Sequence, residues 1–403
     1  GARRGAMTAE APGQAAAPAS EEEAAAARAA QRRREKEAAK RKKEEETRCR
    51  YWTSWDSLER RVQRQRWLVL STSADHGAKL WDFDAQDGKM RATFTGLHEA
   101  AVRVACMDLQ SRYAITGAVD GTLVKWDLER CECQESFLTG KYGAMLSIAS
   151  DFKRGRALTG TGDGIVCVWD TIRLTVIREI PAHEGARVTY VSANFDTGLA
   201  VTGATDGRLR VWDMELGECL GTYEGHDEAV SAVMVDWERS RVLSGSSDGA
   251  LHYWHLDTRS LICALQGHSD RINSLRGDME QGSIVSASND ETALVWDLNA
   301  SRSLGTLTGH KQAVRDSAVD FGQQLAVTCS DDGSLRVWDL ARMRSRGTLQ
   351  GHLDRVNVLC ARFDRNRVLS GSVDCSMRLW DLEAMACEEA FYSHAGSVLS
   401  FTM

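Results

Sequence analysis

GHDEAVSAVMVDWERSRVLSGSSDGALHYWHL is the sequence of residues 225–256, and GHLDRVNVLCARFDRNRVLSGSVDCSMRLWDL is that of residues 351–382. Both contain short runs such as VLSGS, in which apolar and polar residues alternate, bounded by turn residues such as Asp-Gly. This pattern predicts short antiparallel strands joined by tight turns. The two stretches therefore read as two copies of one β-structured unit.

The same unit recurs along most of the chain, and four of its features keep a fixed spacing. Eight tryptophans lie 45, 43, 43, 42, 42, 42 and 42 residues apart, at Trp81, Trp126, Trp169, Trp212, Trp254, Trp296, Trp338 and Trp380. Six residues before each is an aspartate, at Asp75, Asp120, Asp163, Asp206, Asp248, Asp290, Asp332 and Asp374. Four residues before each aspartate is a hydroxyl, at Ser71, Thr116, Thr159, Thr202, Ser244, Ser286, Thr328 and Ser370. Most aspartates also follow a histidine by 22 or 23 residues, at His98, His183, His226, His268, His310 and His352.

Two positions depart from this spacing. The second interval has Lys141 where the other repeats have a histidine, and Trp254 is followed by His255, whereas the other seven tryptophans are followed by Asp. We interpret His255 as a tolerated variant at the end of a strand.

The spacing resembles that of the WD-repeat family over about residues 68–403. The resemblance implies a β-propeller in which each repeat supplies four strands. Such a sheet has two apolar faces, and packing the sheets radially buries each face against a neighbour. The resemblance further implies that the His, Ser/Thr, Asp and Trp of a repeat form one hydrogen-bonded network with a structural role. The donors and acceptors of these side chains allow a closed chain of this kind.

Eight such units predict an all-β propeller of eight blades, closed by a C-terminal strand. The unit that begins near Trp67 has no convincing first strand, whereas VLSFTM at the end of the chain aligns with VSAVMV from Val230. We therefore expect residues 398–402 to complete the first blade and His394 to join its network. A seven-bladed ring, a truncated ring, and a first strand supplied by residues 57–67 are the alternatives.

The charge distribution divides the chain into a tail, residues 1–66, and the propeller, residues 67–403. The tail carries a net charge of +6 and the remaining residues a net charge of −13. Strong helix formers follow Ser20, so we expect a charged helix after a disordered start. The basic run from Arg32 to Lys43 could alternatively form a nuclear-import or RNA-contacting patch.

Composition also limits the class of protein. The eleven cysteines are scattered and form no C-x-x-C pair, and no apolar run approaches the roughly 20 residues that span a bilayer. These features predict reduced thiols in a soluble protein of the cytoplasm, with the nucleus as the alternative. The negative charge of the propeller disfavours general binding to nucleic acid.

Signatures of catalysis are missing. The sequence contains no nucleophile elbow, phosphate-binding loop, H-E-x-x-H motif or compact Cys/His ligand set. The Asp, His and Ser residues recur in nearly every repeat, as a structural role predicts, whereas a catalytic site is usually unique. We therefore expect no catalytic residues, metal or cofactor.

The resemblance implies that partners meet one rim of the ring, at residues that vary between blades. The corresponding strand positions are Arg103, Arg187, Arg271, Asn273, Arg315, Arg355 and Asn357, and the turn positions are Val119, Thr205, Ser247, Asn289, Asp331 and Val373. Arginine is enriched at binding hot spots and can pair with two carboxylate or phosphate oxygens at once. This predicts a site for acidic peptides or phosphopeptides at one mouth of the ring. The alternative is that each arginine caps a nearby acidic loop, such as those of Asp270 and Asp354.

Three functions follow from these observations. The first is a non-enzymatic scaffold that presents loop surfaces to partner proteins during complex assembly. The second is a component of a ribonucleoprotein or nuclear complex that uses the basic tail. The third, which the sequence supports least, is an enzyme with an unrecognised site in the central channel.

Overall fold

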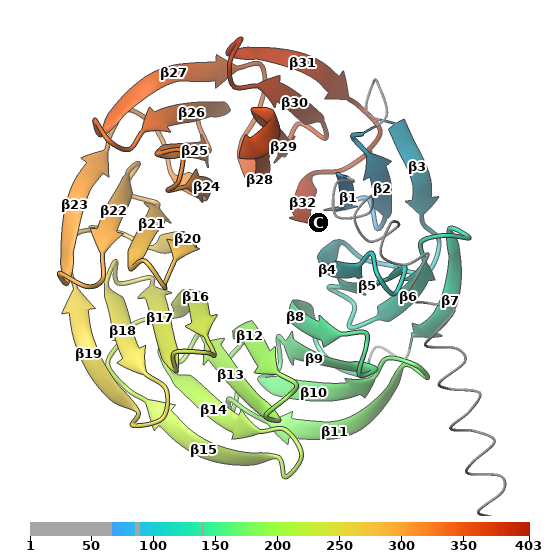
Figure 1. Cartoon of the computed structure of the whole chain (residues 1–403). Coiled ribbons are helices and arrows are strands. Elements are labelled where there is room, and N and C mark those ends of the chain that lie inside the picture. The colour runs from blue at the N-terminus through green and yellow to red at the C-terminus, as the bar shows by residue number, and fades with distance from the viewer. Residues whose placement is uncertain (1–66, 85–88, 139–140) are drawn as a thin grey trace, which may run out of the picture. The chain divides into compact units, whose positions relative to one another are not determined.

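The computed structural model describes residues 67–84, 89–138 and 141–403. These residues form 32 β-strands and one short 3-10 turn, η1 (Phe363–Arg365). The strands make eight antiparallel sheets of four strands each, arranged as a ring around a central channel (Figure 1). The predicted eight-bladed, all-β propeller is therefore confirmed. The interpretations of the tail, residues 1–66, lie outside the described residues.

The four strands of each blade run from the channel to the outer edge of the ring (Figure 1). The innermost strands of blades 1 to 8 are β32 (Val398–Thr402), β4 (Val102–Asp108), β8 (Met145–Asp151), β12 (Val188–Asn194), β16 (Val230–Asp236), β20 (Ile272–Asp278), β24 (Val314–Asp320) and β28 (Val356–Arg362). The second strands are β1 (Leu68–Ser73), β5 (Tyr113–Ala118), β9 (Arg156–Thr161), β13 (Leu199–Ala204), β17 (Arg241–Ser246), β21 (Ser283–Ser288), β25 (Leu325–Ser330) and β29 (Arg367–Ser372). The third strands are β2 (Ala78–Asp82), β6 (Leu123–Asp127), β10 (Ile165–Asp170), β14 (Leu209–Asp213), β18 (Leu251–His255), β22 (Ala293–Asp297), β26 (Ser334–Asp339) and β30 (Met377–Asp381). The outermost strands are β3 (Lys89–Phe94), β7 (Glu132–Phe137), β11 (Thr175–Pro181), β15 (Glu218–Tyr223), β19 (Ser260–Leu265), β23 (Arg302–Leu307), β27 (Arg344–Gln350) and β31 (Ala386–Phe391).

Burial changes across each blade in the way that the sequence pattern requires. In blade 5, the second strand β17 is buried at every residue after Arg241, whereas the outermost strand β19 is mostly exposed. Small and β-branched residues fill the second strands because both of their faces meet a neighbouring blade. The turn that follows needs a left-handed residue, and Gly249 supplies it with a φ of 78°. A Cβ atom there would lie 2.6 Å from the carbonyl oxygen of His268, so the glycine also lets the next loop approach.

The hydrophobic core consists of eight clusters, and each cluster joins two neighbouring blades. The cluster between blades 8 and 1, for example, packs Leu369 and Met377 against Trp81 and Val398. Eight interfaces for eight blades leave no sheet face without a neighbour. This is the radial burial that the repeat predicts.

The ring closes through the C-terminal strand. β32 pairs antiparallel with β1, with Phe401 opposite Ser71, and it takes the place of the innermost strand of blade 1. The prediction that residues 398–402 complete this blade is confirmed. The place proposed alternatively for residues 57–67 is occupied by β32, and the ring is neither seven-bladed nor open.

Candidate functional site

A hydrogen-bonded network centred on the tryptophan recurs in the blades. In all eight, the indole Nε1 donates to the hydroxyl of the second strand over 2.7–3.0 Å. In blade 8, Nε2 of His352 also lies 2.7 Å from the Ser370 hydroxyl, and its Nδ1 lies 2.9 Å from Asp374. Blades 1, 4, 6 and 7 contain the same chain of four residues, and in blade 1 its histidine is His394.

Blade 2 contains the same residue types with a different connection. Nδ1 of His98 lies 2.6 Å from the Thr122 hydroxyl, which in turn donates to Asp120 at 2.5 Å. The histidine and the aspartate are therefore joined through a second hydroxyl.

Blade 5 loosens the connection between histidine and aspartate. Nδ1 of His226 lies 3.4 Å from Asp248, which is longer than the corresponding distances of 2.7–3.0 Å in blades 1, 4, 6, 7 and 8. A second buried histidine, His252, stacks on His226 with ring centroids 4.0 Å apart. Neither Nδ1 atom has a hydrogen-bond partner among the described residues. Burial and the neighbouring His252 lower the pKa of His226 to about 4.

Blade 3 contradicts the assignment of Lys141 to the histidine position. Tyr142 takes that place: it is buried, and the backbone amide of the following Gly143 donates to Asp163 at 2.7 Å. The residue after the histidine makes the equivalent bond in blade 8, where Leu353 donates to Asp374. The assignment was wrong because the interval between this position and the aspartate is one residue shorter in blade 3.

The electrostatics of the network are those of a stable structural element. Burial works against ionisation of Asp374, but hydrogen bonds from His352, Ser376 and the Leu353 amide hold its pKa well below its usual range. Burial also raises the pKa of the thiols of Cys106 and Cys167, to about 11 and about 12, which removes them as nucleophiles. Recurrent side chains of this kind, connected from histidine to aspartate in blades 1, 4, 6, 7 and 8, stabilise the blades.

The positions expected to meet partners lie together at the start of the innermost strands. In each blade, the backbone amide of the turn residue before the aspartate donates to the residue that precedes the strand, for example Asn289 to Arg271 and Val373 to Arg355. Two residues after the residue that precedes the strand, every innermost strand contains a β-bulge. A bulge leaves one residue outside the ladder and re-aims its side chain. The bulged residues are Leu399, Arg103, Leu146, Thr189, Ser231, Asn273, Arg315 and Asn357.

The structure brings the arginines to this end of the channel, which we call the arginine mouth: Arg103, Arg187, Arg271, Arg315 and Arg355. Burial, followed by the charges of Arg315 and Arg103, lowers the pKa of Arg271, so side chains from blades 2, 6 and 7 interact across the opening. Arg315 is neutralised within its own blade, because its guanidinium binds both carboxylate oxygens of Asp331.

The other four guanidinium groups of the arginine mouth have no carboxylate partner among the described residues. The carboxylates of Asp270 and Asp354 accept the backbone amides of Arg271 and Arg355, at 2.6 Å and 2.7 Å, and form no ion pair with their guanidinium groups. The sequence suggested, as an alternative, that these acidic loops hold the arginine side chains. The two aspartates instead bind the main-chain amides of the arginines.

Two predicted partner residues instead link neighbouring blades. Asn273 donates to the carbonyl oxygen of Val314 at 2.8 Å and to the side chain of Asn289, and Asn357 donates to Val398 at 2.9 Å. Their amide groups are engaged in holding the ring together. Among the turn positions, Val119 is exposed, whereas Thr205 accepts the backbone amide of Arg187.

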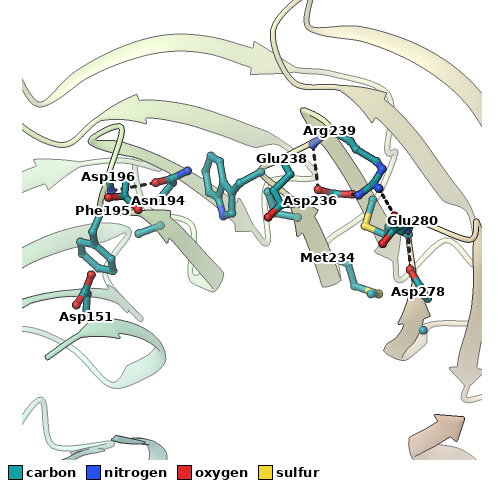
Figure 2. A pocket seen from close by; sticks show the side chains of 15 residues that line it. Asp151, Asn194, Phe195, Asp196, Met234, Asp236, Glu238, Arg239, Asp278 and Glu280 are labelled. Carbon is teal, nitrogen blue, oxygen red and sulfur yellow. Dashed lines mark hydrogen bonds and ion pairs between the residues drawn. The ribbon is translucent and has the colours of Figure 1, made fainter. Parts of the chain in front are cut away.

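The sequence interpretation missed the opposite end of the channel, where the innermost strands end. A pocket of about 950 Å³ lies there, at the ends of β8, β12, β16 and β20 and in the turns that follow. Figure 2 shows carboxylate side chains around it, including Asp151, Asp236 and Asp278 at the strand ends. The signal in the sequence was an Asp or Asn at each strand end followed by a large apolar residue, as in Asp236-Trp237. We call this site the strand-end pocket.

Other kinds of site find no support in the described part of the chain. Within it, no group of three or more His, Cys, Asp or Glu side chains is placed to hold a metal ion. The ten cysteines that the structure describes are all free. None of the described helical segments is long and apolar enough to cross a membrane.

Comparisons with known proteins agree with the observed architecture. The family model described as WD domain, G-beta repeat, matches residues 174–213, 217–255, 259–297, 301–339 and 343–381. The crystal structure of the computationally designed Ika8 protein is similar to the chain, with a TM-score of 0.68 and 27% sequence identity. That match covers 78% of this chain and 93% of the designed one. The search of curated proteins finds no match.

Proposed function

The chain belongs to the WD-repeat family of β-propellers, and on that premise we propose that it acts as a non-enzymatic scaffold whose arginine mouth binds an acidic segment of a partner protein. The observation that carries this proposal is the set of arginines there that have no carboxylate partner. Like charges held near one another at a channel opening attract an anion, and a guanidinium can bind a carboxylate through two hydrogen bonds.

The contrast with arginines elsewhere supports this interpretation. Arg276 lies 3.1 Å from Asp316, and Arg367 lies 3.1 Å from Glu388, so the fold pairs many of its arginines internally. The propeller is acidic as a whole, which makes a basic opening a local feature rather than a reflection of composition. Arg271 and Arg355 are the most direct candidates, because both lack an ion pair among the described residues.

The structure changes the ranking of the predicted contact residues. Arg315 is already bound by Asp331, and the two asparagines link blades, so we expect these three to shape the site rather than bind the partner. Arg103 and Arg187, like Arg271 and Arg355, remain available to bind the partner. A location in the cytoplasm, with the nucleus as the alternative, is part of the same proposal. A component of a ribonucleoprotein or nuclear complex that uses the basic tail is the alternative function.

The test is affinity purification with mass spectrometry on the intact chain beside the double variant Arg271→Glu/Arg355→Glu. We expect the variant to lose a defined set of partners that share acidic segments. The matched control is Arg173→Glu/Arg344→Glu, which changes the net charge equally at exposed arginines of an outer turn and an outermost strand. Partner recovery that is the same in both variants would overturn the proposal.

A further inference from the structure

Beyond the proposed function, we infer that the strand-end pocket is a second docking site, which binds a basic segment of a partner protein that also carries apolar side chains. The two ends of the channel would then receive partners of opposite charge.

The pocket is the larger part of a groove. Its 950 Å³ extend over the ends of four innermost strands, in blades 3 to 6. A neighbouring hollow of about 440 Å³ shares Gly277 and Asp278 with it and continues along the ends of β20, β24 and β28. An elongated depression across several blades fits a stretch of polypeptide better than a small ion.

The floor of the pocket is apolar. Phe195, Met234, Trp237 and Met279 line it, and all four are only partly buried. One side of each packs against the core between two blades, which explains why these residues are large. The other side lines the hollow, and an apolar group of a ligand would cover it. Met234 and Met279 add side chains that adapt their shape to a ligand.

The rim of the pocket is strongly acidic. Six carboxylates and one arginine, Arg239, line it; the carboxylates are Asp151, Asp196, Asp236, Glu238, Asp278 and Glu280. The carboxylates at the strand ends stabilise the turns that follow them: Asp236 accepts a hydrogen bond from the Arg239 amide, and Asp278 accepts one from the Glu280 amide. The carboxylates in the turns, Asp196, Glu238 and Glu280, do not stabilise the turns in this way.

Of the turn carboxylates, Glu238 is fully available to a ligand, and Asp196 and Glu280 are each shared with one arginine. Asp196, Glu238 and Glu280 are exposed (Figure 2). Arg154 offsets part of the charge of Asp196, and Arg239 part of that of Glu280. Glu238 has no partner among the described residues. The rim keeps an excess of negative charge over an apolar floor after these ion pairs are counted.

These properties specify the occupant. A lysine or arginine extends an apolar stem that would lie on the floor, and it carries its charge to the height of the rim carboxylates. A peptide in which pairs of basic residues alternate with leucine satisfies both parts of the pocket. An acidic peptide would be repelled, so the acidic segment expected at the arginine mouth does not fit this pocket.

The experiment measures fluorescence anisotropy with the intact chain and a labelled peptide, KRLAKRLAKRLA. The test variant is Asp196→Asn/Glu238→Gln/Glu280→Gln, and we expect it to bind the peptide about tenfold more weakly, because three exposed charge pairs of modest strength are lost. The matched control is Glu132→Gln/Glu215→Gln/Glu383→Gln, which removes three exposed carboxylates outside the pocket, and its affinity should be unchanged. A second peptide, with serine in place of leucine, keeps the charge and should bind more weakly to the wild-type chain.

Several outcomes would overturn the inference: no binding to the wild-type chain, equal losses in the two triple variants, or equal affinity for the two peptides. Equal losses would mean that the peptide senses only the overall negative charge. Binding that emerges only after Arg41, Lys42 and Lys43 are changed to glutamine would assign the pocket to the chain's own tail instead of a partner. The Arg271→Glu/Arg355→Glu variant should bind the peptide normally, so failure here and failure of the proposed function are distinguishable.

Discussion

Blade 8 and blade 3 solve the same structural problem with different side chains. In blade 8, His352 connects the loop between blades to Ser370 on the second strand and to Asp374 in the turn. In blade 3, Tyr142 fills the equivalent place and its hydroxyl donates to Glu179 on the outermost strand, at 2.6 Å. Trp169 still donates to Thr159.

Besides the indole bond, both blades keep the bond from the loop amide to the aspartate. The carboxylate therefore secures the loop whether or not a histidine is present, and the histidine adds a connection to the second strand. Blade 5 stands between them, because it has the histidine but a longer contact to the aspartate and a second histidine stacked on the first.

The largest expected effect comes from removing the aspartate. Asp374 accepts bonds from His352, the Leu353 amide and Ser376, so Asp374→Ala leaves several buried donors unpaired and should lower the free energy of unfolding by about 3 kcal/mol. Asp163→Ala should cost about 1 kcal/mol, since the loop amide of Gly143 is exposed and can turn to water. Urea unfolding followed by circular dichroism measures both. Equal losses would show that the histidine connection adds nothing.

The next effect is a loss of stability in mild acid, to which blade 5 contributes through its stacked histidines and blade 2 through His98, whose pKa burial also lowers to about 4. The pKa of His226 is lowered to about 4, below the ordinary value of about 6.5, so its neutral form stabilises the fold. This stability is fully present above about pH 6.5 and is lost as the pH falls toward 4, by about 2 kcal/mol at pH 5. Burial lowers the pKa of His252 as well, which adds to the effect.

Melting temperatures between pH 7 and pH 4.5 test this prediction while the aspartates stay ionised. His252→Leu should reduce the pH dependence, because Leu294 occupies the equivalent position in blade 6. The reciprocal change, Leu294→His, should steepen it. An unchanged profile in both variants would place the acid sensitivity outside the stacked pair.

A smaller effect on stability is expected at the bulged residue of the innermost strand of blade 8. Asn357 in blade 8 donates to Val398 and helps to close the ring, whereas Leu146 holds the same position in blade 3. Asn357→Leu should lower the free energy of unfolding by about 1 kcal/mol, the value of one neutral hydrogen bond. Differential scanning calorimetry would detect this, and a stability equal to that of the wild type would mean that apolar packing replaces the bond fully.

The smallest effect is expected for Tyr142→Phe. The ring keeps its contacts with Phe137 and Trp169, and the hydroxyl loses its bond to Glu179 and the longer bond, 3.4 Å, that it accepts from Lys141. Because Glu179 is partly exposed and also pairs with Lys141, we expect a cost of about 0.5 kcal/mol. A loss as large as that of Asp374→Ala would show that this hydroxyl matters as much as the network of blade 8.

The candidate sites were predictable only in part. The spacing located the ring of positions at the start of the innermost strands, because each is fixed relative to the repeat. It did not distinguish Arg271, which lacks an ion pair among the described residues, from Arg315, which binds Asp331. Nor did it show that Asn273 reaches the next blade, since its partner Val314 lies 41 residues away.

The sequence by itself determined the repeating four-stranded unit, and it predicted eight blades and the strand that closes the ring, which the structure confirms. These follow from short-range patterns of burial and turns repeated eight times, and each copy reinforces the others. Only the tertiary structure decided which charges remain unpaired, that Tyr142 takes the place of a histidine, and that the strand ends of four blades line one pocket. The physical reason is that these features depend on side chains from different blades, whose distances are set by radial packing and are absent from any single repeat.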